Sequence, residues 1–235
     1  MAQRAITLLR ARALSPKVRE LTFDPGPGFD FAPGQWVSLK IPHPSADEPL
    51  ARSYSIASAP RTDHTFDVAV TRVDEGPGST YLHALSVGDT VQAAEPLGFF
   101  TLPARLERPL LLVGTGTGVA PFRAMIQGIQ GRPDPPPVTL LFGVRRQEDV
   151  LYADEFAALA ARDPRFRFEP TLSRPDEGWT GRVGYVQRHL PAMLEAAPEA
   201  DAYVCGLNAM VREARKVLRE TLGLPRDRVH SERFD

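Results

Sequence analysis

The 235-residue sequence contains a single cysteine, Cys205. One thiol cannot form an internal disulfide, and it cannot by itself build a four-cysteine zinc site or a cysteine-ligated iron–sulfur cluster. The five histidines are scattered along the chain without the spacing of metal ligands. We therefore predict no metal site and no iron–sulfur cluster within this chain.

Net charge and long apolar runs are also nearly absent. The 28 Lys and Arg residues are balanced by 29 Asp and Glu residues, which leaves a net charge of −1 and no overall field to attract nucleic acid or an anionic bilayer. Residues 1–20 lack both the apolar centre of a secretion signal and any run of roughly 18 apolar residues that could span a bilayer. We therefore expect a cytoplasmic protein with no nucleic-acid partner and no membrane insertion.

The composition that remains is that of a folded protein with two domains. The content of 43% hydrophobic and 24% charged residues is ordinary for a globular chain, and 235 residues exceed the usual size of one domain. The patterning changes near residues 102–108, where Pro103 and Pro109 interrupt regular structure. We place one domain over residues 1–103 and the second over residues 104–235.

The first domain has the pattern of short β-strands. Apolar residues alternate with others at Leu21 and Phe23, at Val37, Leu39 and Ile41, and at Phe66, Val68 and Val70. Alternation with a period of two predicts strands with one buried face, and turns rich in glycine and proline separate them. The first domain is therefore expected to be an antiparallel sheet or barrel.

The second domain alternates strands with helices. Residues 110–113 form a short apolar run typical of a parallel strand that is buried on both faces. A glycine-rich turn and a helical pattern that ends at Gly131 follow. Strand and helix patterns recur at 138–142, 154–161, 166–169 and 203–205, with a further helix from about Asn208. This order predicts a parallel sheet covered by helices.

Arg52-Ser53-Tyr54-Ser55 places a cation, an aromatic ring and a hydroxyl close together. On a strand, Arg52 and Tyr54 share one face and Ser55 takes the other, so a bend or a strand end is needed to bring all three together. The chemistry suits a flavin, but without further context the spacing favours ordinary strand packing and surface hydrogen bonding.

Two glycine-rich turns could each hold a phosphate. Gly76-Pro77-Gly78-Ser79-Thr80 precedes an expected short helix over 81–85, which Ser79 is placed to cap; a simple capped turn is the alternative. Residues 114–121 run from a buried strand into a helix, a geometry that favours pyrophosphate. They depart from the common dinucleotide fingerprint, because Val119 occupies the position of its third glycine.

Together these segments resemble the ferredoxin–NADP reductase superfamily, whose Arg-x-Tyr-Ser flavin motif matches residues 52–55 and whose Gly-Gln-Trp matches residues 34–36. The resemblance implies an antiparallel flavin-binding β-barrel followed by a Rossmann-like parallel α/β domain that binds NAD(P). It assigns Arg52 to the flavin phosphate, Tyr54 to packing against the isoalloxazine and Ser55 to the vicinity of flavin N5. It also assigns the first of the two glycine-rich turns, with Gly76, Gly78, Ser79 and Thr80, to the flavin phosphate.

The resemblance extends through the second domain. Gly116, Thr117, Gly118 and Pro121 match the NAD(P)-binding loop, and Arg145, Ser173 and Arg174 match nucleotide-binding positions. It implies that Cys205 and Gly206 lie beside the nicotinamide and that Glu232 and Phe234 lie near the flavin, although Asp235 extends past the usual terminal aromatic residue. Without this context, Arg145 and Arg174 could be solvated arginines and Cys205 a small buried residue.

The implied reaction is hydride transfer between NAD(P)H and bound FAD, with FMN the less favoured flavin and with Ser55, Cys205 and Glu232 beside the reacting atoms. Ser173 and Arg174 resemble the pair that receives the 2′-phosphate of NADP in some members of the superfamily, which favours NADPH over NADH. Because one cysteine cannot hold an iron–sulfur cluster, the electron acceptor is expected to lie outside this chain. The resemblance makes a redox protein of the ferredoxin type the leading candidate. The alternatives are a reductase of free flavin, and an electron-transfer subunit or nucleotide sensor that is inactive alone.

Overall fold

The computed structural model describes residues 3–42 and 48–234. By the contacts among its residues, the chain divides into two compact units. The first unit comprises the chain up to Leu102 together with Ala120–Gly131, and the second comprises Pro103–Val119 and the chain from Arg132 onwards. The helix α2 (Ala120–Gln130) therefore belongs to the first unit, although Pro103–Val119 and the chain from Arg132 onwards belong to the second.

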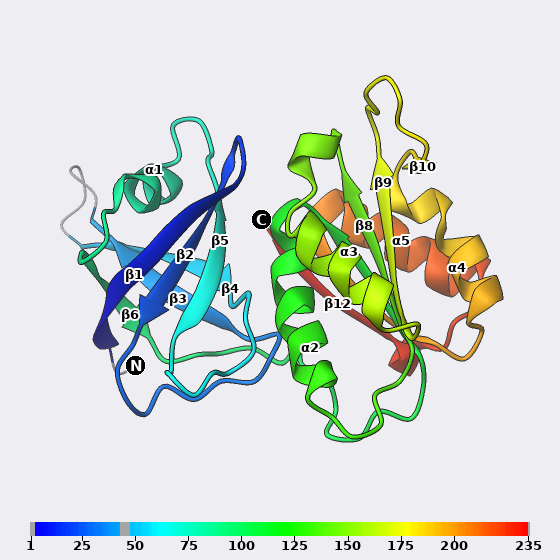
Figure 1. Cartoon of the computed structure of the whole chain (residues 1–235), viewed down its shortest axis with the longest axis horizontal. Helices are drawn as coiled ribbons and strands as arrows, with labels where there is room; N and C mark the ends of the chain where they lie inside the picture. Colours follow the sequence, from blue (N-terminus) through cyan, green and yellow to red (C-terminus); the bar gives the residue numbers. More distant parts are fainter. Residues whose placement is uncertain (1–2, 43–47, 235) are drawn as a thin grey trace. The chain divides into compact units, whose positions relative to one another are not determined.

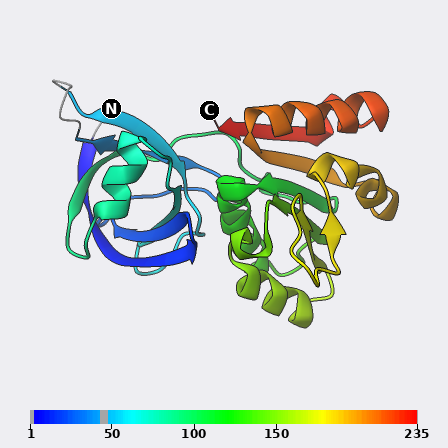
Figure 2. The same ribbon diagram turned by 90° about the horizontal axis from the view of Figure 1, so that it is seen from above.

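The described residues of the first unit form a six-stranded antiparallel sheet in the order β4-β3-β6-β1-β2-β5 (Figures 1 and 2). An isolated bridge between Ile56, just after β4, and Val68 of β5 joins the two edges of the sheet, which therefore closes on itself as a barrel. The strands are β1 (Gln3–Ser15), β2 (Val18–Asp24), β3 (Trp36–Ile41), β4 (Leu50–Ser55), β5 (Phe66–Thr71) and β6 (Thr90–Ala94). The prediction of an antiparallel barrel is confirmed.

The barrel has its core where the alternating pattern placed it. Leu21, Val37, Leu39 and Ile41 are fully buried in one hydrophobic cluster, because successive side chains of a strand point to opposite faces. A short helix, α1 (Pro77–Ala84), contributes Leu82 to the same cluster.

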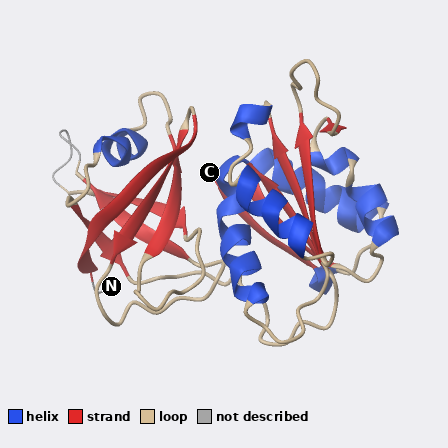
Figure 3. Cartoon of the chain, viewed as in Figure 1, coloured by secondary structure: helices blue, strands red, loops and turns tan. Residues whose placement is uncertain are grey.

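The described part of the second unit forms a six-stranded sheet in the order β10-β9-β8-β7-β11-β12, with every neighbouring pair parallel (Figure 3). The strands are β7 (Leu110–Thr115), β8 (Val138–Val144), β9 (Phe166–Leu172), β10 (Arg182–Val183), β11 (Asp201–Leu207) and β12 (Val229–Phe234). The chain moves outward from β7 to β10 and then returns to the other side of β7 at β11. Open parallel sheets bind ligands at such a reversal, beyond the carboxyl ends of the strands, so the ends of β7 and β11 mark the expected site.

Helices cover both faces of this sheet, as the alternating pattern predicted. On one face α4 (Leu190–Ala196) and α5 (Asn208–Lys216) pack against a cluster that includes Leu111 and Leu141. On the other face, Phe156 of α3 (Ala153–Arg162) packs against Phe168 of β9, with 5.3 Å between the ring centroids. Within the described ranges, no helix is both long and apolar enough to cross a membrane.

Candidate functional site

The end of β4 brings together the residues of the predicted flavin motif. Arg52 and Tyr54 lie on one face of the strand, and Ser55 is its last residue, which provides the strand end that the motif requires. Arg52 is exposed, Tyr54 is half-buried and Ser55 is buried. Burial raises the pKa of Tyr54 above its usual value, although the Arg52 cation acts in the opposite direction. The phenol is therefore neutral at physiological pH.

The glycine-rich turn before α1 lies against these side chains. A Cβ atom built on Gly78 would lie 3.1 Å from Cγ of Arg52 and 3.3 Å from the hydroxyl oxygen of Tyr54. The absence of a side chain at Gly78 therefore allows the first turn of α1 to approach both residues. The first-turn N–H groups of a helix have no acceptor inside the helix, and they favour an anion. Together with the Arg52 guanidinium, this arrangement fits the phosphate of a flavin cofactor.

The predicted helix cap at Ser79 is wrong. The helix begins at Pro77, four residues before the expected start, and Gly76 occupies the N-cap position without a side-chain cap. Ser79 consequently lies inside the first turn, where its hydroxyl accepts the N–H of Val73 at 3.0 Å and lies 3.1 Å from the carbonyl of Gly76. The side chain fixes the loop before the helix, while Thr80 is exposed and donates its N–H to Gly76.

In the second unit, the predicted nucleotide loop follows the central strand β7. Residues Gly116–Val119 form a single 3-10 turn that leads directly into α2, whose second residue is Pro121. A Cβ atom on Gly118 would lie 2.4 Å from the carbonyl oxygen of Cys205, so only glycine lets the turn pack against the end of β11. Gly116 has a φ of +53°, a conformation that favours glycine. Thr117 lies half-buried between these two glycines.

Thr115 is a site residue that the sequence reasoning missed. Its Oγ1 atom is buried and has no hydrogen-bond partner among the described residues. Gly206, with a φ of +147°, lies so close that a Cβ atom there would be 2.4 Å from this oxygen. An unpaired buried hydroxyl at the carboxyl ends of the two central strands fits a polar ligand, because such a group is normally hydrogen-bonded. The sequence feature that could have identified Thr115 is its position as a polar residue at the end of an apolar strand.

The structure brings Cys205 and Glu232 together. They are register partners on the parallel strands β11 and β12. Cys205 is fully buried, and burial, with a smaller contribution from the Glu232 carboxylate, raises the pKa of its thiol well above the usual value. The thiol is therefore neutral, which suits packing or hydrogen-bond donation and does not suit nucleophilic attack.

The residues predicted to bind the adenosine end of the dinucleotide also converge. The N–H of Ser173 donates to the carbonyl of Val144 at 3.0 Å, and the N–H of Arg174 donates to the carbonyl of Arg145 at 2.9 Å. Two exposed arginines, Arg145 and Arg174, thus lie side by side at the carboxyl ends of β8 and β9. A third nearby cation, Arg182, is paired with Glu169 at 2.8 Å.

Phe234 is the last residue of β12 and pairs in register with Leu207. Asp235, which the sequence analysis singled out as an extension past the terminal aromatic residue, lies outside the described residues. The predicted site residues thus fall into two sets, one at the end of β4 and α1 in the first unit, and one at the carboxyl ends of the sheet in the second.

Two family models match the chain. An oxidoreductase FAD-binding domain covers residues 5–102, and an oxidoreductase NAD-binding domain covers residues 112–216. A curated relative from Sorangium cellulosum, named ferredoxin--NADP reductase B, is 44% identical over 97% of this chain and 96% of its own length. The anthranilate 1,2-dioxygenase electron transfer component of Acinetobacter baylyi is 32% identical over 88% of this chain, which spans 59% of that relative.

Solved structures agree with these matches. A cytochrome P450 reductase from Amycolatopsis superposes with a TM-score of 0.84 at 30% identity, over 99% of this chain and 70% of that one. A ferredoxin NADP+ reductase from Neisseria gonorrhoeae, solved with bound FAD and NADP, has the same fold, with a TM-score of 0.85 at 23% identity over 99% of each chain. This chain belongs to the ferredoxin–NADP reductase superfamily and is a flavin- and NAD(P)H-dependent oxidoreductase with an FAD-binding domain and an NAD-binding domain.

Proposed function

We propose that this protein exchanges a hydride between NADPH and FAD and passes the electrons singly to a separate redox protein of the ferredoxin type. The observation that carries the choice of acceptor is the 44% identity, over nearly the full length of both chains, to a relative named ferredoxin--NADP reductase. The single cysteine supports it, because these 235 residues cannot supply a cysteine-ligated cluster as an internal acceptor.

In the first unit, Arg52 and the first-turn amides of α1 hold the flavin phosphate through charge-assisted hydrogen bonds. Tyr54 packs as a neutral ring against the isoalloxazine, and Ser55 places its hydroxyl near N5. The bound FAD and dinucleotide supply the redox chemistry themselves, by hydride transfer between nicotinamide C4 and flavin N5.

In the second unit, the Gly116–Val119 turn and the start of α2 hold the pyrophosphate. Thr115 offers its unpaired hydroxyl to the dinucleotide. Cys205 and Gly206 pack beside the nicotinamide, where the neutral thiol excludes water. Glu232 places a negative charge beside Cys205, and Phe234 shields the flavin until the nicotinamide enters.

The preference for NADPH rests on Arg145 and Arg174. Both arginines are exposed at the carboxyl edge of the sheet, where Arg174 follows Ser173 and donates its backbone N–H to the carbonyl of Arg145. Arginine binds phosphate through a planar fork of N–H donors, so this group is suited to the 2′-phosphate that distinguishes NADPH from NADH.

The flavin-loaded protein tests the proposal. After gel filtration, FAD should remain bound, NADPH should bleach it anaerobically, and a [2Fe–2S] ferredoxin should accelerate the reduction of cytochrome c. Loss of the flavin, combined with turnover of added free flavin, would instead identify a free-flavin reductase. Failure of both nicotinamides to bleach bound FAD would identify a subunit or sensor that is inactive alone. We also propose that the protein is cytoplasmic, which fractionation of cells tests. We propose that the two domains divide between residues 103 and 104, which separate expression of the two segments tests.

A further inference from the structure

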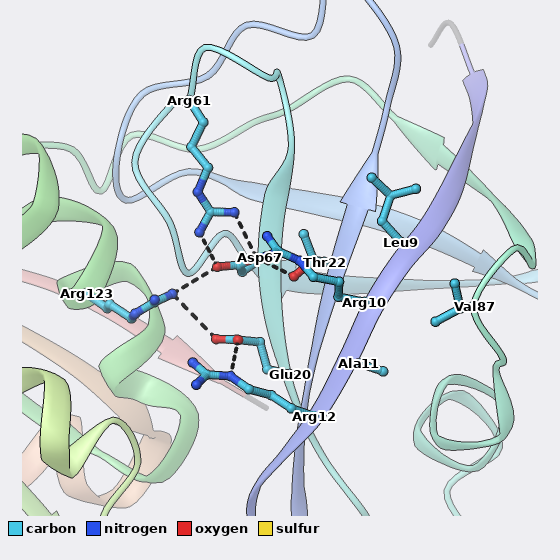
Figure 4. A pocket seen from close by; sticks show the side chains of 10 residues that line it. All are labelled: Leu9, Arg10, Ala11, Arg12, Glu20, Thr22, Arg61, Asp67, Val87 and Arg123. Atoms are coloured by element: carbon cyan, nitrogen blue, oxygen red, sulfur yellow. Dashed lines mark hydrogen bonds and ion pairs between the residues drawn. The ribbon is translucent and has the colours of Figure 1, made fainter.

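A buried arginine ties α2 to the barrel. Arg123 is 6% exposed, and its Nη1 atom donates to the carboxylate of Asp67 at 3.0 Å (Figure 4). It also donates to the carbonyl oxygen of Ala57 at 2.9 Å. The same atom lies 3.5 Å from the carboxylate of Glu20. One side chain of α2 therefore contacts β2, β5 and the segment that follows β4.

Asp67 fixes that segment independently. Its backbone carbonyl accepts the N–H of Ala57 at 2.7 Å, and its backbone N–H donates to the hydroxyl of Ser58 at 3.0 Å. Its carboxylate accepts the hydroxyl of Thr22 at 2.8 Å in addition to the guanidiniums of Arg61 and Arg123. The residues directly after Ser55, the last residue of the flavin strand, are thus held by the same aspartate that binds α2.

A second contact lies one helical turn further along α2. The side-chain oxygen of Gln127 accepts the N–H of Ala59 at 3.0 Å. Arg123 and Gln127 are four residues apart and therefore lie on one face of the helix. That face binds two alternate residues of the segment after β4, so the helix is fixed both along its axis and in its rotation.

This cluster places three guanidiniums around two buried carboxylates at considerable desolvation cost. Glu20 and Asp67 are buried, and each faces two guanidiniums, those of Arg12 and Arg123 and those of Arg61 and Arg123 respectively. Burial raises the pKa of the Asp67 carboxyl, but its bonds with Arg61, Thr22 and Arg123 outweigh burial and leave the pKa below the usual value. Apolar side chains would pack such a contact with less desolvation, whereas a directional charge cluster fixes one register.

We propose that Arg123 is a positioning residue that fixes the start of α2 and, with it, the dinucleotide-binding turn that directly precedes α2 in the chain. The turn Gly116–Val119 ends one peptide bond before α2 begins at Ala120, so the contacts of Arg123 and Gln127 fix the first turn of α2 and, through chain continuity, the residues that hold the pyrophosphate. This inference rests on the proposed dinucleotide site. The contacts described for Arg123 are all with residues of the barrel, so its proposed role is indirect.

The test compares Arg123→Met with Arg61→Met in the flavin-loaded protein. Both substitutions remove one guanidinium from Asp67 and keep an unbranched apolar stem, but only Arg123 lies on α2 and contacts Ala57. We expect Arg123→Met to raise the Kd for NADP+ by about tenfold, because a displacement of ~1 Å in a binding group can lower activity by a still larger factor. We also expect faster amide hydrogen exchange over residues 116–122. Arg61→Met should leave both quantities within about twofold of wild type, and flavin affinity should change little in either variant.

Equal effects of the two substitutions on the Kd and on exchange would overturn the inference and leave Arg123 as a stabilising residue only. If Arg123→Met does not fold, Gln127→Leu replaces it, with an expected threefold rise in the Kd and faster exchange over residues 116–122; unchanged values would overturn the inference. The exchange measurement needs no dinucleotide. A wild-type protein that binds neither NADP+ nor NAD+ would contradict the proposed function, while the exchange comparison would still decide the role of Arg123.

Discussion

Replacing Gly118 by alanine should displace the dinucleotide-binding turn. The added Cβ atom would lie 2.4 Å from the carbonyl oxygen of Cys205, 2.7 Å from its carbonyl carbon and 2.8 Å from Cα of Gly206. All three are backbone atoms of β11 or its end, and they cannot rotate away. Restoring an ordinary contact distance therefore requires the turn to move by about 1 Å, and overpacking of this kind costs ~1–3 kcal/mol.

A shift of about 1 Å in the residues that hold the pyrophosphate should lower kcat/KM for the dinucleotide by 10- to 100-fold, which is about 1.4–2.7 kcal/mol. Stopped-flow reduction of bound FAD at varied NADPH measures this, with calorimetry for the Kd of NADP+. Gly131→Ala is the matched control, because a Cβ atom there meets no atom nearer than 4.0 Å. A Gly118→Ala variant with the kcat/KM and Kd of wild type would refute the close approach of this turn to β11.

Four further predictions address other parts of the two sites. Arg52→Gln should weaken FAD binding by about 10- to 100-fold, because a hydrogen bond to a charged group contributes ~1.5–3 kcal/mol. Retention of the flavin in gel filtration measures this loss of affinity, and the affinity for NADP+ should be unchanged. Arg174→Gln should lower kcat/KM about tenfold for NADPH but not for NADH, and an equal loss for both would contradict a 2′-phosphate contact. Cys205 should resist iodoacetamide at pH 8 until the protein unfolds, since its thiol is buried and its pKa is raised; mass spectrometry of the native protein decides. Asp67→Asn should cost about 3 kcal/mol of unfolding free energy at pH 7. Because the pKa of Asp67 is lowered in the fold, the stabilisation by its carboxylate is present above about pH 4 and is lost as the pH falls through the folded pKa. Denaturant titrations at several pH values measure the difference in unfolding free energy between Asp67→Asn and wild type. A difference that does not depend on pH would contradict this prediction.

Much of the fold could be predicted because local periodicity reports burial. The alternation at Val37, Leu39 and Ile41 and the continuous apolar run of β7 correspond to a one-sided and a two-sided buried strand. β12 escaped prediction, because Val229–Phe234 carries histidine, serine, glutamate and arginine between its two apolar ends. Its pairing with β11 is a tertiary preference that overrides the local sequence.

The candidate site was predictable as a set of motifs but not as a geometry. The capping role of Ser79 failed because the helix begins at Pro77, a start that the preference of proline for the first helical position would have indicated. Arg123 and Asp67 are separated by 56 residues in the sequence, so no local pattern could connect them. The unpaired hydroxyl of Thr115 becomes visible only once Gly206 is placed beside it.

The central claim is that this chain binds FAD and reduces it with NAD(P)H, and one measurement tests it most directly. The purified flavin-loaded protein is titrated anaerobically with NADPH and, separately, with NADH, while the flavin absorption band is recorded. We expect the band to bleach with about one equivalent of NADPH, because one hydride carries both electrons that FAD accepts. A band that persists with both nicotinamides would contradict the account.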